Sequence, residues 1–127
     1  MASEAVILST FRKRLASFMA GKGELAPIKF MAFGDGGHDS HNVAISPLES
    51  DTELKHELLR KPLALIRQED EFSVTGKGAV EPTELVGEYV SEAALIDANG
   101  KIIAIKTFAP KIKEADERYE INIKVRF

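Results

Sequence analysis

The chain is 127 residues long, which is the length of one domain and leaves no room for a second sizeable core. Apolar residues make up 44% and charged residues 29%, and this balance excludes a wholly disordered chain, a collagen and a membrane protein. The net charge of −3 is too small to imply a nucleic-acid partner, and the lack of cysteine excludes a disulfide framework and a thiolate metal site. We therefore expect a single globular domain, residues 1–127, with no nucleic-acid or membrane partner.

The first predicted element is a helix over residues 4–20, with Ser3 as its N-cap and Gly21 at its end. Apolar side chains recur along it at spacings of four and three, which places on one face Ile7, Phe11, Leu15 and Phe18. Residues 12–14 of the same helix are all basic. Two interpretations of this basic run stay open: a solvated helix face, or a salt bridge to an acidic partner surface.

A short strand is predicted over residues 28–33, followed by a glycine-rich break and a long polar surface loop over residues 38–49. Residues 50–61 are predicted to form a second helix, because Ser50 and Glu53 fit a capping box. The apolar stripe of this helix would consist of Leu54 and Leu58.

Beyond residue 62 the spacing of apolar residues changes to two, which indicates β-strands. Residues 63–66 and 72–80 are predicted to form a hairpin that turns at residues 69–71. Residues 119–127 alternate without fault between apolar and polar side chains. One face of this last strand is therefore expected to be buried and the other to face water.

The strongest local signal is a hairpin formed by residues 89–96 and 101–109. The Asn99-Gly100 pair between these strands accepts positive φ, so we expect a type I′ turn there. Both strands are largely apolar on both faces, which favours a place in the centre of the sheet. The predicted fold class is α+β, with two helices packed on a largely antiparallel β-sheet in an arrangement that could be sandwich-like.

The segment Gly34-Asp35-Gly36-Gly37 resembles a phosphate-binding loop at first sight, but no Gly-Lys-Ser/Thr ending follows it. We interpret it instead as a tight turn whose glycines adopt positive φ.

Four side chains in and after this turn are weak candidates for metal ligands, because imidazole and carboxylate groups at short spacing can bind a divalent ion such as zinc. They are Asp35, His38, Asp39 and His41. A site built wholly on one loop would be poorly preorganised, so we predict no metal and no cofactor. A small metal- or ligand-binding domain that uses residues 35–41 remains the alternative function.

Glu92 lies within an apolar strand, where a charged group is costly unless it is paired. Lys106 on the facing strand is its candidate partner. The glutamate would either face solvent and form a salt bridge, or form a buried ion pair that fixes the strand register. No Gly-x-Ser-x-Gly elbow or other nucleophile setting is present, so we expect no enzymatic activity.

Several segments, taken in order, carry a resemblance to a known family. They are MAFGDGG at residues 31–37, ELLRKP at residues 57–62, and SEAALIDANGK at residues 91–101 with IAI at residues 103–105. Together they are similar to the N-terminal domain of phage tail-collar or tail-fibre proteins, from contractile-tailed phages and related prophages. The residues that we single out as its structural motif are Gly34, Asp35, Gly36, Gly37, Arg60, Glu92, Asn99 and Gly100.

The resemblance implies a structural protein of the virion tail that is made in the cytoplasm of the bacterial host. It implies attachment of a fibre to a phage baseplate protein, a role in fibre assembly, and self-association as a homotrimer. A chaperone or regulator of phage assembly is a third possibility. The first helix and the last strand each present an apolar face, and we expect the copies to associate through these faces.

A full fibre would continue beyond Phe127 with a trimeric shaft and a receptor-binding tip. We therefore expect a cloned domain, the product of a truncated prophage gene, or a small separate collar protein. Recognition of a host receptor is not assigned to this chain.

Overall fold

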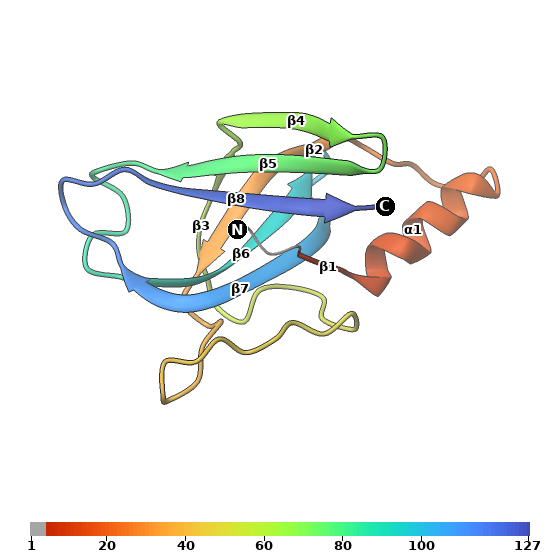
Figure 1. Ribbon diagram of the computed structural model, residues 1–127. Coiled ribbons are helices and arrows are strands. Elements are labelled where there is room, and N and C mark those ends of the chain that lie inside the picture. The colour runs from red at the N-terminus through yellow and green to blue at the C-terminus, as the bar shows by residue number, and fades with distance from the viewer. Residues whose placement is uncertain (1–4) are drawn as a thin grey trace.

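Two antiparallel β-sheets face each other in the computed structural model, which describes residues 5–127 (Figure 1). The elements in chain order are β1 (Val6–Ile7), α1 (Ser9–Met19), β2 (Ile28–Gly34), β3 (Glu57–Pro62), β4 (Leu65–Asp70), β5 (Ser73–Val80), β6 (Tyr89–Asp97), β7 (Ile102–Ile112) and β8 (Tyr119–Arg126). The predicted N-cap Ser3 and the first predicted helical residue, Glu4, lie outside the described residues.

The large sheet has five strands in the order β1-β7-β6-β2-β3, and the small sheet has three in the order β4-β5-β8. β6 is the middle strand of the large sheet, so the predicted central position of the β6–β7 hairpin is confirmed. Figure 1 shows the small sheet across one face of the large sheet and the irregular segment 35–56 across the other. Both faces of the large sheet are therefore covered.

The main core lies between the two sheets. Its buried side chains include Met31, Phe33 and Leu95 from the large sheet and Ile121, Ile123 and Val125 from β8. The predicted alternation of the last strand is confirmed, because the side chains between these three β8 residues are exposed or half-buried. This apolar face is covered by the large sheet of the same chain, so the expectation that a second copy would cover it is wrong.

Two glycines on β5 allow the sheets to pack closely. A Cβ atom on Gly78 would lie 2.4 Å from the sulfur of Met31, and one on Gly76 would lie 2.9 Å from a methyl carbon of Leu95. The predicted hairpin in this region is confirmed as β4 and β5, although β4 extends through Asp70 and the turn follows it. The weak apolar pattern of β5 thus reflects close packing of the two sheets.

The predicted second helix over residues 50–61 is wrong. Leu54, one of its two stripe residues, is buried on the outer face of the large sheet, where it packs with Ala32, Ala94 and Ile96. Residues from Glu57 onward form β3, which pairs antiparallel with β2 at the edge of the sheet. The free edge of β2 offers a row of backbone hydrogen bonds, and these outweigh a helix propensity that amounts to a few tenths of a kcal/mol per residue.

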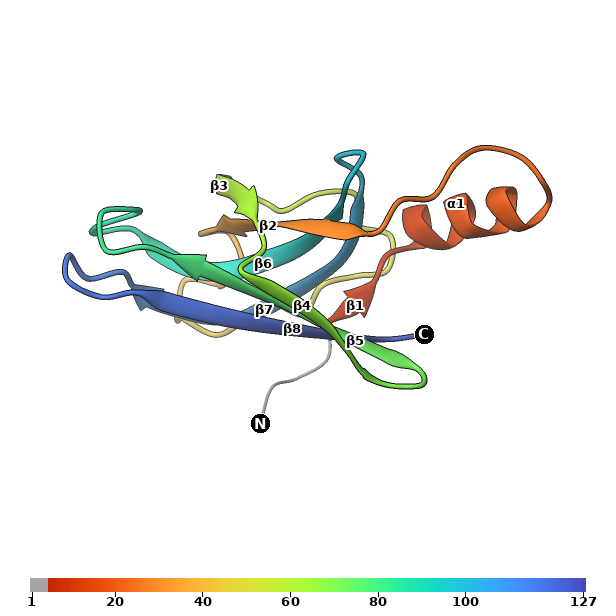
Figure 2. The ribbon, with the colours of Figure 1, turned by 90° about the horizontal axis from the view of Figure 1, so that it is seen from above.

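The predicted first helix is shorter than expected, because β1 takes Val6 and Ile7 into a pair with β7. Helix α1 has no buried residue, and it projects beyond one end of the sandwich (Figures 1 and 2). Few contacts hold it there. The Arg14 guanidinium donates to the Ile102 carbonyl at 2.6 Å, and the rings of Phe11 and Phe127 lie 5.9 Å apart.

The predicted α+β fold with two helices packed on a sheet is therefore wrong. In the described residues the structure is mostly β, with one short helix that covers neither sheet face. The sandwich arrangement, which the sequence left open, is the one observed. No helix in the described part of the chain combines the length and hydropathy needed to span a membrane.

The turn of the β6–β7 hairpin differs from the predicted type I′ turn. Gly100 N–H donates to the Asp97 carbonyl at 3.0 Å, which places Ala98 and Asn99 in the centre of the turn. Positive φ occurs there only at Gly100, at 80°, and not at Asn99. The Asp97 carboxylate fixes this turn by accepting from the backbone N–H groups of Asn99 and Lys101, each at 2.9 Å.

Because Gly100 adopts a left-handed conformation, replacing it with valine is expected to destabilise the fold. A Cβ atom at this position would meet nothing within 4 Å, so the cost comes from the backbone alone. We expect Gly100→Val to lower the free energy of unfolding by about 1 kcal/mol or more. Gly100→Asn should cost less, because asparagine tolerates positive φ. Thermal melts of both variants test this, and a Gly100→Val protein with the melting temperature of the wild type would contradict it.

Candidate functional site

A buried carboxylate organises the outer face of the large sheet. Glu92 on β6 is only 1% exposed and forms no ion pair among the described residues. Its Oε2 atom accepts from the backbone N–H groups of Gly36 and His56, each at 2.9 Å, and its Oε1 atom accepts from Lys55 N–H at 3.0 Å. Three backbone donors therefore compensate the buried charge, and they clamp both ends of the segment 35–56 onto the sheet.

The predicted pairing of Glu92 with Lys106 is wrong. Lys106 lies opposite Ala93, so its side chain points to the other face of the sheet from Glu92. Its ammonium group donates to the Asn122 carbonyl of β8 at 3.0 Å, and burial lowers the pKa of Lys106. The glutamate therefore neither faces solvent nor forms a buried ion pair.

Three glycines at the start of the segment allow the backbone to approach closely enough for this clamp. A Cβ atom on Gly34 would lie 2.3 Å from the His56 carbonyl oxygen, and one on Gly36 would lie 2.6 Å from the Lys55 Cβ atom. A Cβ atom on Gly37 would lie 2.2 Å from the Ser91 carbonyl oxygen. None of these three glycines has positive φ, so the interpretation of the segment as a positive-φ turn is wrong. They are required because the backbone approaches β6 and the segment's own far end closely.

The four candidate metal ligands have separate contacts. The Oδ1 atom of Asp35 lies 2.6 Å from His56 Nδ1. His38 Nδ1 is hydrogen-bonded to the Ser91 hydroxyl at 2.8 Å. The Asp39 carboxylate accepts from the backbone N–H groups of His41 and Val43 at 2.8 and 3.0 Å. Within residues 5–127, no three histidine, aspartate or glutamate side chains gather as a metal site would require.

Arg60, also singled out from the sequence, lies on the edge strand β3. Its guanidinium forms two hydrogen bonds with the Glu57 carboxylate, at 3.0 and 2.9 Å, and this contact raises the pKa of Arg60. The pair is partly exposed and lies on the same strand, so it contributes little to stability.

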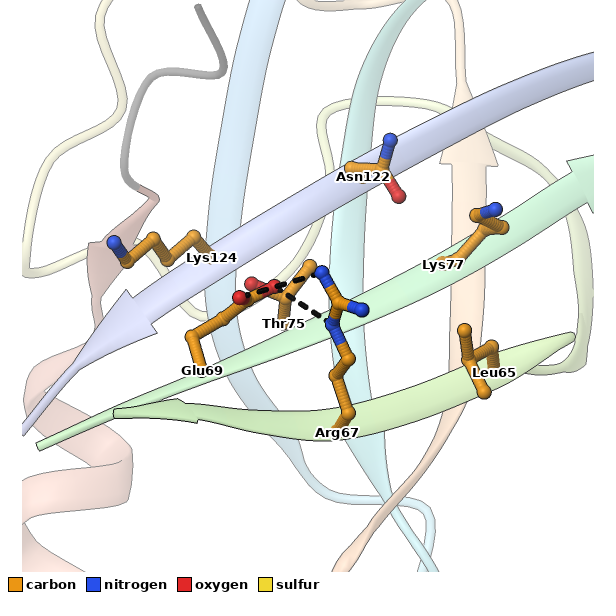
Figure 3. Close-up of a pocket in the computed structure, with 7 residues that line it drawn as sticks. All are labelled: Leu65, Arg67, Glu69, Thr75, Lys77, Asn122 and Lys124. Atoms are coloured by element: carbon orange, nitrogen blue, oxygen red, sulfur yellow. Dashed lines mark hydrogen bonds and ion pairs between the residues drawn. The ribbon is translucent and has the colours of Figure 1, made fainter. Parts of the chain in front are cut away.

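The outer face of the small sheet carries a shallow polar depression of about 480 Å³ (Figure 3). It is lined by Leu65, Arg67, Glu69, Thr75, Lys77, Asn122 and Lys124. The Arg67 guanidinium donates to the Glu69 carboxylate at 3.1 Å, and Lys77 Nζ lies 3.9 Å from Glu120 Oε1. Charges of both signs alternate on this open face, which is the pattern of a solvated sheet surface.

An apolar groove of about 430 Å³ lies at the α1 end of the sandwich. Its walls come from α1 and the chain that follows it, from β2, β4, β5 and β7, and from the residue after β8. The apolar residues that line this "α1 groove" are Phe11, Leu25, Ala26, Pro27, Ile28, Ile66, Val74, Ile103 and Phe127. The groove is open, and apolar side chains continue from it along α1.

The exposed side chains of α1 make the groove part of a larger apolar surface. Phe18 is 46% exposed and Met19 74% exposed, and Leu15 lies beside them on the helix. The tip of the β4–β5 hairpin adds the exposed ring of Phe72. An exposed apolar patch rimmed by charged residues is typical of an interaction site. The broad apolar face of the helix was visible in the sequence, whereas the β4, β5 and Phe127 walls depend on tertiary packing.

Removal of the Glu92 charge is expected to destabilise the protein. In Glu92→Gln an amide NH₂ group replaces one of the two accepting oxygens and faces backbone donors, so we expect a loss of about 2 kcal/mol or more. Glu53→Gln, an exposed change on the same segment, is the matched control and should stay within about 0.5 kcal/mol of the wild type. Urea unfolding measures both. Equal stability of the two variants would contradict the clamp.

The contact between Asp35 and His56 predicts a pH dependence. The hydrogen bond from His56 to Asp35, and then the charge of Asp35, raise the pKa of His56 above 6.5. The stabilisation from this pair is thus fully present below pH 6.5 and is lost as the pH rises through the folded pKa. NMR titration should show a lower His56 pKa in Asp35→Asn, and the same His56 pKa as the wild type in Asp39→Asn. An unchanged value in Asp35→Asn would show that the contact is absent in solution.

The sequence matches the family model described as phage tail-collar fibre protein, N-terminal, over residues 1–126. No curated protein matches the chain. The match covers all but the last residue and includes every segment that carried the resemblance in the sequence. The chain therefore belongs to the phage tail-collar fibre protein family, and it is a component of the virion tail.

Proposed function

We propose that this chain attaches a tail fibre to the phage baseplate and takes part in fibre assembly as a homotrimer. The observation that carries the proposal is the apolar surface at the α1 end, formed by the α1 groove and the exposed residues of α1. Both faces of the large sheet are covered by the chain itself, and the apolar face of β8 lies in the core. The α1 end is therefore the apolar surface best suited to a partner.

The character of helix α1 supports this role. An isolated helix of 11 residues is marginal in water, and α1 has no buried residue to stabilise it. Packing of its exposed apolar side chains against another protein would add tertiary contacts to the few that hold the helix in a single chain. In a cyclic assembly the same end of every copy faces the same way, which suits a fibre that starts from a symmetric attachment point.

A structural role also fits the contacts of the candidate chemical groups. Membership of a family of tail-fibre proteins favours a protein without catalytic activity. The histidine and aspartate side chains of residues 35–41 form hydrogen bonds within the fold or lie in an exposed turn. No contact in the described residues favours the alternative of a metal- or ligand-binding domain.

The proposal predicts that polar substitution on α1 weakens assembly without unfolding the protein. Phe18→Ser should reduce the trimeric fraction in sedimentation equilibrium and reduce the amount of this protein that co-purifies with phage tails. The matched control is Val86→Ser, because Val86 is 50% exposed and lies in the loop between β5 and β6 at the opposite end of the sandwich (Figure 1).

The wild type is expected to sediment near three times 13.9 kDa, and Val86→Ser should behave like it. A wild type that stays monomeric at micromolar concentrations would contradict the trimer. Tails that retain a normal amount of the Phe18→Ser protein would contradict attachment through the α1 end.

A further inference from the structure

We propose that α1 of one copy binds in the α1 groove of a second copy, with its basic residues against the acidic tip of the second copy's β4–β5 hairpin. This inference rests on the proposed self-association and names the two surfaces that would meet.

The cations of α1 differ in whether they already have a partner in the same chain. Arg14 already donates to the Ile102 carbonyl and lies over the Phe11 ring, with its guanidinium carbon 5.8 Å from the ring centroid. Arg12 and Lys13 are exposed and form no ion pair among residues 5–127. The helix therefore presents two uncompensated positive charges next to its exposed apolar side chains.

The opposite charge lies at the tip of the β4–β5 hairpin. Glu69, Asp70 and Glu71 are consecutive there and directly follow Arg67 and Gln68, which both line the α1 groove. Glu69 pairs with Arg67, and Asp70 lies 3.9 Å from Arg126. Glu71 is exposed and has no ion pair among the described residues. The acidic tip also carries the exposed ring of Phe72. It therefore presents negative charge beside apolar surface, whereas α1 presents positive charge beside apolar surface.

The chain's own helix does not fill the groove. Phe11 of α1 forms one wall, and Ile66 and Val74 of the hairpin form another, so the open space lies between the helix and the hairpin. Figures 1 and 2 show α1 and the β4–β5 turn at the same end of the sandwich but apart from each other. A second copy can supply a helix whose apolar side chains would fill this space and whose cations would meet Glu71 at the hairpin tip beside it.

The contact is heterologous, because it joins two different surfaces of the same chain. Heterologous contacts close into rings when the rotation between neighbours allows it, and a ring of three copies would satisfy every helix and every groove. An isologous dimer through α1 alone would instead place like charges of residues 12 and 13 near each other. Charge complementarity thus favours the helix-to-hairpin contact.

Charge reversal tests this inference. Arg12→Glu with Lys13→Glu, and separately Glu69→Lys with Glu71→Lys, should each weaken self-association by about tenfold or more. The variant that carries all four substitutions should recover association, because both charged surfaces are then reversed together. The matched control reverses two cations at the opposite end of the sandwich, Lys111→Glu at the end of β7 with Arg118→Glu before β8 (Figure 1), and should associate like the wild type. Sedimentation equilibrium gives the association constants, and thermal melts verify that each variant folds.

The wild type offers a second measurement that needs no substitution. Its self-association should weaken as sodium chloride is raised, because salt screens exposed charges. Association that survives in both reversed pairs, or that fails to recover in the four-substitution variant, would overturn the helix-to-hairpin contact and leave the proposed trimer standing. A wild type that never associates would overturn the contact and the trimer together.

Discussion

The buried carboxylate of Glu92 is the interaction on which the cover over the outer face of the large sheet depends. A charged group inside a sheet must find hydrogen-bond donors, and no cation within residues 5–127 supplies them. The donors are three backbone N–H groups from the two ends of the segment 35–56, and they are in reach only because glycine occupies positions 34 and 36. These hydrogen bonds hold an irregular segment across the sheet. Leu54 of that segment packs in the cluster on the outer face. The bound residues Lys55 and His56 directly precede β3.

This arrangement determines which surfaces remain for partners. The small sheet covers one face of the large sheet, the clamped segment covers the other, and the last strand contributes its apolar face to the core. The helix receives no comparable cover. Phe127 and Phe11 meet at the base of α1, and beyond them Leu15, Phe18 and Met19 are exposed. The α1 end is therefore the surface through which we propose that the protein engages its neighbours.

Local sequence patterns predicted the parts of this fold that local contacts decide. The β6–β7 hairpin, the last strand and the β4–β5 hairpin follow from alternation and turn residues, and all three are present. The prediction of a second helix was wrong because the spacing of Leu54 and Leu58 fits a helix, and the edge of β2 that competes for these residues is not visible in the sequence. The partner of Glu92 was missed for a related reason. One position of strand register places Lys106 on the opposite face, and backbone donors from residues 36, 55 and 56 leave no side-chain pattern.

Hydrogen–deuterium exchange at low and high protein concentration tests the central claim, that a clamped sandwich associates through its α1 end. We predict that the amides of Gly36, Lys55 and His56 are protected at both concentrations, because Glu92 binds them within one chain. Amides of α1 and of residues 66–72 should gain protection only at the concentration where the protein associates. Rapid exchange of the three clamped amides at either concentration would contradict the account, and so would equal exchange of α1 at both.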